Sequence, residues 1–178
     1  MAAKLWGKAR VRYGLAYLKF SKGGSVQQIL HHIKYKGVKE AAHLLGMWYG
    51  HDLCLTPIGK AFDLIIPVPM HKSKLRKRGY NQSDLFAQGL AESMEVQYSS
   101  QALERIQKGS TQTNKGRSDR WKNVDGIYQV RQPEEIYQKR ILLVDDVATT
   151  GATFETCIEK LYEHGAKEIS IGVIAMAE

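Results

Sequence analysis

The sequence predicts an α/β fold built around a mostly parallel sheet, and three observations carry this prediction. Two short apolar runs, FDLIIPVP from Phe62 and RILLV from Arg140, are typical of strands that are buried on both faces. Helical segments lie between the apolar runs, which is the order expected when crossover helices join parallel strands. The chain has 178 residues, 43% of them hydrophobic, which is enough for one domain with a core.

Residues 1–60 are expected to form a strand and a helical cap on this core. A strand is expected near residues 16–20. Ser25 and Gln28 have the spacing of a capping box, which predicts a helix from Ser25 that Gly37 ends. A second helix is expected over about 39–49. Its apolar side would carry Ala41, Ala42, Leu44, Leu45 and Trp48.

Residues 61–178 form the predicted core. After the first buried strand, the expected elements are a basic loop over 71–79, a helix over 81–95, strands near 102–107, 126–130 and 140–144, a helix over 153–164 and a strand over 168–176. The polar stretch 108–125 is too long for a passive connection. We therefore expect a flexible functional loop there.

The net charge of +8 is concentrated in two groups. Such groups suit a polyanion, either nucleic acid or a phosphorylated small molecule. A solvated basic face is the alternative, and charge alone does not decide between the two. The groups are Lys72, Lys74, Arg76, Lys77 and Arg78, and then Lys115, Arg117, Arg120 and Lys122.

Cysteine content and hydropathy exclude several classes of protein. Cys54 and Cys157 are the only cysteines and form no CxxC pair, which excludes a disulfide framework or a zinc site built from cysteines of this sequence. We expect both thiols to be buried apolar fillers. No apolar run is long enough to span a membrane, and residues 1–14 do not resemble a signal peptide. We expect a cytoplasmic protein without membrane insertion.

The strongest functional signal is the pair Asp145 and Asp146, directly after the buried run ILLV. Open parallel sheets bind ligands at the carboxyl ends of their strands. Two adjacent carboxylates in such a place need hydrogen-bond donors or a cation. Sugar hydroxyls provide the donors, and Mg²⁺ provides the charge.

The residues after the acid pair predict a phosphate site. Thr149, Thr150, Gly151, Ala152 and Thr153 lead into a helix, whose free N–H groups and positive dipole end favour an anion. Glycine permits close approach of a ligand to the backbone. Diol-binding acids followed by a phosphate cradle predict a site for a 5-phosphorylated ribose. The plain alternative is a turn followed by a capped helix. No P-loop or dinucleotide-binding fingerprint is present.

The stretch ILLVDDVATTGAT resembles the phosphoribosyl-pyrophosphate (PRPP) motif of type I phosphoribosyltransferases. HHIKYKG, IIPVPMHKSKLRKRGYNQSDLFAQGLA and TQTNKGRSDRWKNVDGIYQV extend the resemblance to the ComF family, whose members are linked to DNA uptake in competent bacteria. The resemblance implies a type I phosphoribosyltransferase fold, with a doubly wound sheet, a hood-like cap over 1–60 and a flexible loop. ComF proteins usually begin with a cysteine-rich zinc ribbon, which this sequence lacks.

The resemblance also implies roles for individual residues. Asp145 and Asp146 would hold the ribose hydroxyls and Mg²⁺, the implied cofactor. The 5-phosphate would lie on residues 149–153. Lys77, Arg78 and Gly79 would contact pyrophosphate, and Lys115 and Arg117 would close over it from the flexible loop.

Two functions remain open from the sequence. The first is transfer of the phosphoribosyl group from PRPP to an unknown acceptor, with release of pyrophosphate. The second is a non-catalytic module that senses PRPP or a nucleotide, while its basic surface serves nucleic acid or a protein partner in DNA uptake.

Overall fold

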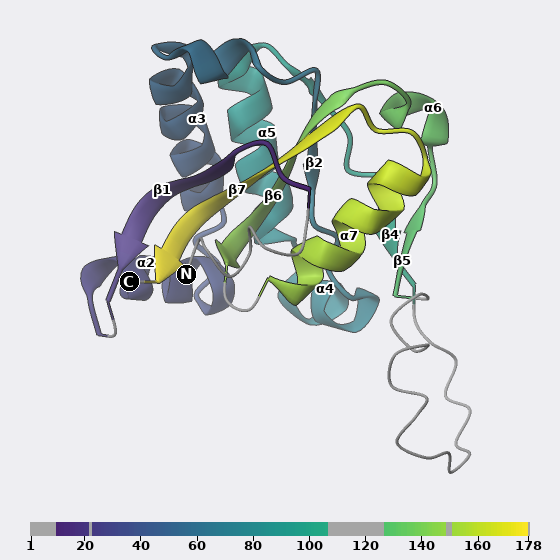
Figure 1. Ribbon diagram of the computed structural model, residues 1–178. Helices are drawn as coiled ribbons and strands as arrows, with labels where there is room; N and C mark the ends of the chain where they lie inside the picture. The colour runs from purple at the N-terminus through teal and green to yellow at the C-terminus, as the bar shows by residue number, and fades with distance from the viewer. Residues whose placement is uncertain (1–9, 22, 107–126, 149–150, 178) are drawn as a thin grey trace, which may run out of the picture.

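A computed structural model describes residues 10–21, 23–106, 127–148 and 151–177. Its centre is a five-stranded sheet in the order β1-β7-β6-β2-β3, in which all neighbouring strands run parallel (Figure 1). The strands are β1 (Gly14–Phe20), β2 (Leu64–Pro67), β3 (Gln97–Tyr98), β6 (Arg140–Ala148) and β7 (Glu168–Ala177). The predicted α/β fold with a parallel sheet is confirmed.

Helices cover both faces of the sheet. Apolar residues of α2 (Ser25–Tyr35), α3 (Glu40–Cys54) and α5 (Gln82–Met94) pack together against one face. On the other face α7 (Ala152–Glu163) packs with smaller elements (Figure 1). These are the helix α6 (Pro133–Ile136) and the antiparallel strands β4 (Leu103–Arg105) and β5 (Tyr128–Val130). A short 3-10 helix, η1 (Pro57–Lys60), leads into β2, and the helix α4 (Lys72–Arg78) follows it. The sheet is therefore doubly wound.

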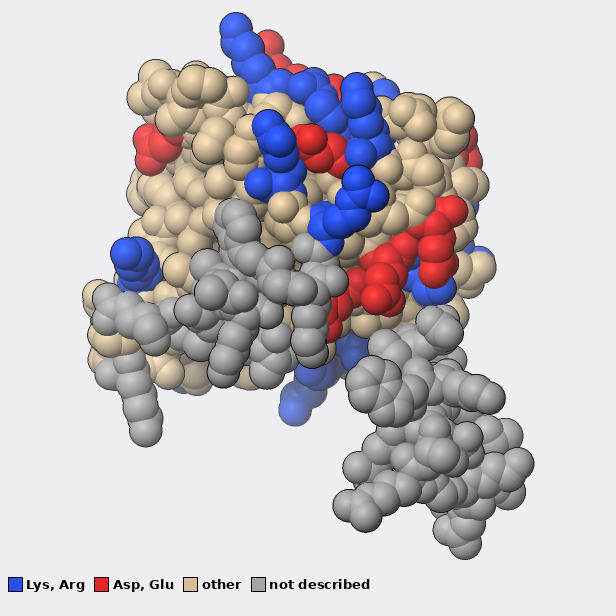
Figure 2. Space-filling view, viewed as in Figure 1, with Lys and Arg blue, Asp and Glu red and all other residues tan. Residues whose placement is uncertain are grey.

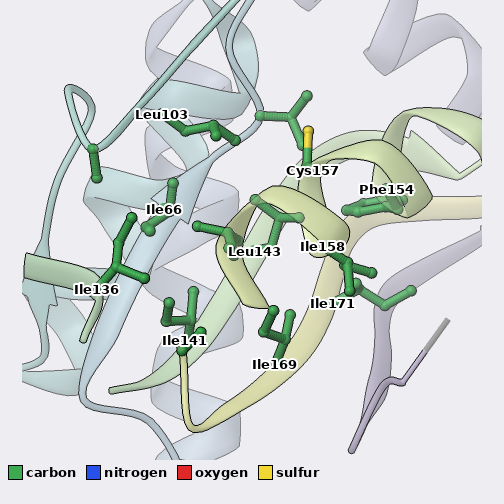
Figure 3. Close-up of a cluster of buried hydrophobic side chains, with 14 of the residues drawn as sticks. Ile66, Leu103, Ile136, Ile141, Leu143, Phe154, Cys157, Ile158, Ile169 and Ile171 are labelled. Carbon is green, nitrogen blue, oxygen red and sulfur yellow. The ribbon is translucent and has the colours of Figure 1, made fainter. Parts of the chain in front are cut away.

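Strand β6 supplies side chains to both cores. Ile141 and Leu143 belong to the α7 cluster shown in Figure 3, whereas Leu142 and Val144 belong to the cluster under α3 and α5. Side chains alternate along a strand, so the two residues that follow Val144 are directed to opposite faces. The strand itself continues to Ala148 and pairs with β7 up to that point. The acid pair therefore lies within β6 rather than after it, which corrects the expected strand end.

Burial of one face of α7 fixes the position of its N-terminus in the fold. Phe154, Cys157 and Ile158 pack against Ile141 and Leu143 in the cluster of Figure 3. The N-terminus of α7 is thereby held close behind the carboxyl end of β6. Cys157 is buried as expected, but the prediction for Cys54 is wrong, because that thiol is exposed.

The buried face of α3 agrees with the expected one only in part, because Ala42 and Leu45 are buried and other expected residues are not. The helix extends to Cys54, and Leu44 and Trp48 are 46% and 58% exposed. The buried side instead includes Gly46 and Gly50. A Cβ atom at Gly46 would come 3.0 Å from the backbone nitrogen of Leu90 in α5. The two helix backbones therefore pack closely through glycine, which an apolar pattern does not reveal.

The N-terminal segment contributes a strand to the main sheet. β1 pairs with β7 from Gly14 to Phe20, so this part of residues 1–60 is continuous with the core. Helix α2 begins at Ser25 as expected, but Gly24 is its N-cap and no side chain caps it. The capping-box prediction is therefore wrong, although the helix start is right. A domain boundary near residue 60 stays a prediction.

The expected strands near 102–107 and 126–130 are β4 and β5, which pair with each other outside the main sheet. The expected flexible loop over 108–125 lies outside the described residues. Among the helices that the structure describes, none has the length and apolar character needed to cross a membrane.

Candidate functional site

The acid pair is held by the first turn of α5. Ser83 Oγ donates a hydrogen bond to Asp145 Oδ1 at 2.7 Å, and the Asp146 backbone N–H donates to the same oxygen at 2.8 Å. The helix start is fixed by Asn81, whose side chain accepts from the Ser83 N–H and donates to the Val68 carbonyl. Asn81 thus connects the end of β2 to the helix that orients the carboxylates.

Asp146 has a second set of partners. Its Oδ2 accepts a hydrogen bond from Gln82 Nε2 at 2.5 Å and forms an ion pair with Lys34 Nζ at 2.8 Å. The side-chain oxygen of Gln82, Oε1, accepts a hydrogen bond from the Arg78 guanidinium, which fixes the orientation of the side-chain amide. Asp146 is 6% exposed. A buried carboxylate needs such partners, because desolvation would otherwise favour its neutral form.

Each carboxylate therefore has one oxygen committed to the protein. Within the described part of the chain, Asp145 Oδ2 and Asp146 Oδ1 accept no hydrogen bond. Although the two side chains leave the strand on opposite faces, both line one cavity, so their acceptor oxygens are available to two hydroxyl donors of one ligand. This arrangement can bind a vicinal diol.

The proximity of the two acids also affects protonation. Burial, and then the neighbouring charge of Asp146, raises the pKa of Asp145 to about 6, and the hydrogen bond from Ser83 offsets part of this rise. Two carboxylates this close favour ligands that bring positive charge or several hydrogen-bond donors.

A cavity of about 240 Å³ brings several predicted site residues together. Asp145, Asp146, Arg78 and Thr153 line it. Lys74, a member of the predicted basic group, also lines it, together with residues for which the sequence predicted no binding role: Lys34, Tyr35, Gln82, Ser83, Arg105 and Tyr128. The cavity therefore combines the acid pair with basic side chains from α2, α4 and β4.

The predicted phosphate segment is described in part. Gly151 is the N-cap of α7 and has a φ of 79°, a left-handed conformation that glycine adopts without strain. Ala152 is the first residue of the helix, and Thr153 faces the cavity. Thr149 and Thr150 lie outside the described residues, as do Lys115 and Arg117.

The expected basic loop over 71–79 is mostly helical, which corrects the prediction. His71 caps α4 by accepting from the Ser73 N–H, and Gly79 ends it with a φ of 84°. The guanidinium of Arg78 lies 5.4 Å from the ring centroid of Tyr35. Lys77 faces a neighbouring cavity of about 390 Å³ whose charged lining residues are all basic: Lys34, Lys74, Lys77 and Arg78.

A larger cavity of about 610 Å³ adjoins the acid-pair cavity. The two share Pro69, Met70, Asn81 and Arg105, and the larger one also contains Asp84 and Glu104. Positive charge is not confined to these cavities. Figure 2 shows Lys and Arg side chains gathered at the top of the molecule, away from α4 at its lower edge in Figure 1.

Lys34 is the functional candidate that sequence reasoning missed most clearly. It belongs to HHIKYKG, a segment quoted only for its resemblance. No local pattern connects this residue to an aspartate on β6. Gln82 had a better signal, because it belongs to RGYNQ within the stretch IIPVPMHKSKLRKRGYNQSDLFAQGLA that carries the family resemblance.

Comparison with known proteins identifies the family. A model of the phosphoribosyl transferase domain matches residues 81–177, more than half of the chain. The chain belongs to this family. The matched region includes α5, the acid pair and α7 of this phosphoribosyl transferase domain, whereas Lys34 and α4 lie outside it.

Curated relatives confirm the resemblance to the ComF family. Competence protein F of Haemophilus influenzae is 32% identical over 65% of this chain and 51% of that protein. DNA utilization protein YhgH of Escherichia coli O157:H7 is 31% identical over 61% of this chain and 47% of its own length. Competence protein ComFC of Streptococcus pneumoniae is 30% identical over 62% and 46%. The chain spans about half the length of these relatives.

Solved structures confirm the type I phosphoribosyltransferase fold. The allosteric regulatory enzyme of purine biosynthesis has a TM-score of 0.54 and 22% identity, over 75% of this chain and 25% of that one. Glutamine PRPP amidotransferase from B. subtilis has a TM-score of 0.50 and 21% identity, over 72% and 26%. At these identities the likeness concerns the fold alone.

Proposed function

We propose that this phosphoribosyl transferase domain binds PRPP with Mg²⁺ and transfers the phosphoribosyl group to an acceptor. The observation that carries the proposal is the pair of uncommitted carboxylate oxygens on Asp145 and Asp146, in a cavity that Thr153 of α7 also lines. The ribose hydroxyls of PRPP would donate to these oxygens. Its 5-phosphate would lie at the start of α7, on residues 149–153.

The leaving group has basic side chains available. Arg78 lines the acid-pair cavity, and Lys77 lines the adjoining basic one. These two residues and the turn at Gly79 would contact pyrophosphate, with Lys115 and Arg117 as further contacts from the loop. In the transfer, the acceptor lone pair bonds to C1 while the C1–oxygen bond breaks. Its electrons leave with pyrophosphate, and the acceptor proton passes to solvent. Fixed positive charge near the departing oxygen lowers the barrier.

Mg²⁺ fits the donor set, provided that the ligand completes the coordination. The described residues contain no cluster of three or more metal-binding side chains. Mg²⁺ is commonly held by one or two carboxylates together with substrate phosphates and water. Asp145 and Asp146 would supply the carboxylates, and the bound ion would neutralise charge on the pyrophosphate.

A second candidate function is a PRPP- or nucleotide-binding module that serves DNA uptake without catalysis. The observation that favours it is the naming of the relatives as competence and DNA utilization proteins. On this alternative, the basic surface would contact nucleic acid or a competence protein.

Release of pyrophosphate separates the two functions. PRPP and Mg²⁺ are incubated with the protein and a panel of purine bases, pyrimidine bases, ammonia and small amines. A transferase releases pyrophosphate faster with its acceptor, and Asp146→Asn abolishes that increase. PRPP binding without release in the presence of any acceptor would support the module instead.

A further inference from the structure

The backbone of α2 next to Lys34 is held in place by two contacts of the preceding residue, Ile33. Ile33 is 1% exposed and packs in the cluster with α3 and α5. The Ile33 carbonyl also accepts a hydrogen bond from the Tyr80 hydroxyl, so the end of α2 is connected to the segment between α4 and α5. The position of the Lys34 backbone beside the acid pair is therefore set by the packing of α2, and does not depend only on the ion pair of its side chain.

The ammonium of Lys34 and the amide of Gln82 contact the same oxygen of Asp146. Lys34 Nζ lies 2.8 Å from Oδ2, and Gln82 Nε2 lies 2.5 Å from it. The Lys34 side chain is 26% exposed, and that of Asp146 is 9% exposed. With Oδ2 held from two directions, Oδ1 has no freedom to exchange places with it. The carboxylate then presents one defined acceptor to a ligand.

We propose that Lys34 is the positioning residue for Asp146, and that through it the site selects sugar phosphates that carry an intact vicinal diol. This inference rests on the proposed function and assigns a role to a residue outside the matched family region. Without Lys34, one hydrogen bond from a neutral amide would orient Asp146 beside the like charge of Asp145. The carboxylate would then rotate, and the ligand hydroxyl that donates a hydrogen bond to it would lose its fixed acceptor.

The consequence is a specific loss of selectivity. A site that hydrogen-bonds a hydroxyl rejects the analogue that lacks it, because its polar group is then left unpaired. We expect the wild-type protein to bind ribose 5-phosphate about ten-fold more tightly than either 2-deoxyribose or 3-deoxyribose 5-phosphate. One of the two deoxy sugars lacks the hydroxyl that donates a hydrogen bond to Asp146. Lys34→Met should lose the discrimination against that sugar and keep the discrimination against the other deoxy sugar.

The experiment is calorimetric titration of the three sugar phosphates, and of PRPP, into the wild-type protein, Lys34→Met and Lys34→Ala. Lys36→Met, which removes an exposed charge two residues along, is the matched control and should keep both preferences. Melting curves are recorded for each protein to show that it is folded. Two variants at position 34 are used so that the test still stands if one of them does not fold.

Three results would overturn the inference. Variants at Lys34 that keep both preferences would show that Asp146 is oriented without it. Lys34 variants that bind PRPP more weakly than the wild type but bind ribose 5-phosphate normally would show that Lys34 contacts the pyrophosphate instead. A wild-type protein that binds none of the sugar phosphates would contradict the proposed function itself, and this inference with it.

Discussion

Close packing of α3 on α5 should make Gly89→Ala strongly destabilising. A Cβ atom at this position would lie 2.8 Å from the backbone nitrogen of Met47, and closer still to the carbonyl oxygen of His43. Ordinary contact begins near 3.4 Å, so relief of the Met47 contact alone needs a separation of about 0.6 Å, and relief of the His43 contact needs more. Such overpacking costs about 1–3 kcal/mol or more, and the helix propensity of alanine offsets about 1 kcal/mol. We expect a net loss near 2 kcal/mol, which lowers Tm by about 4–8 °C.

Gly50→Ala is the matched control in the same interface. Its Cβ would lie 3.0 Å from Ser93 Cβ and 3.1 Å from the Leu90 carbonyl oxygen, so every contact there is looser than the tightest contacts at Gly89. Propensity and crowding should nearly cancel there, and the variant should stay within about 1 kcal/mol of the wild type. Urea and thermal unfolding measure both. A Gly89→Ala protein as stable as the wild type, or a larger loss at Gly50, would refute the close-packing argument.

Three further predictions concern single side chains. Hydrogen bonds from Arg140 lower the pKa of Asp63 to about 2. The contribution of Asp63 to stability is therefore complete above about pH 4 and is lost as the pH falls toward 2. In Asp63→Asn, the free energy of unfolding should depend less on pH in that range. Cys54 should react with a thiol reagent in the native protein, whereas buried Cys157, whose pKa burial raises, should react only on unfolding. Arg78→Ala should weaken PRPP more than ribose 5-phosphate, and equal losses would exclude a pyrophosphate contact.

The sheet could be predicted from the sequence because its central strands are short, apolar and flanked by helices. The run ILLV predicts a strand that is buried on both faces, and its side chains lie in both hydrophobic clusters of the structure. The end of β6 could not be predicted in the same way. Asp145 and Asp146 look like the end of a buried strand, but pairing with β7 continues to Ala148.

The buried face of α3 shows why an apolar pattern can mislead. Leu44 and Trp48 suggest the core side, but close approach of backbones requires small residues. Gly46 carries no hydrophobic signal and still decides which side faces α5. The helix α4 was missed because its charged residues resemble a solvated loop. Its signals were His71 before it and Gly79 after it.

The candidate site was predictable where its residues are neighbours in sequence. The acid pair and Thr153 belong to one motif and line one cavity. Lys34 and Gln82 reach that cavity only through the packing of α2 and α5 against the sheet. Contacts between such distant segments depend on tertiary structure, which no local spacing encodes.

The central claim is that the acid pair binds the ribose of PRPP, and calorimetric titration of PRPP with Mg²⁺ tests it most directly. The wild-type protein should bind. Asp146→Asn should bind at least about ten-fold more weakly, because a hydrogen bond to a charged acceptor is lost. Glu159→Gln, at an exposed position on α7, controls for the change in charge and should bind normally. Equal affinity of the wild type and a folded Asp146→Asn protein would contradict the account.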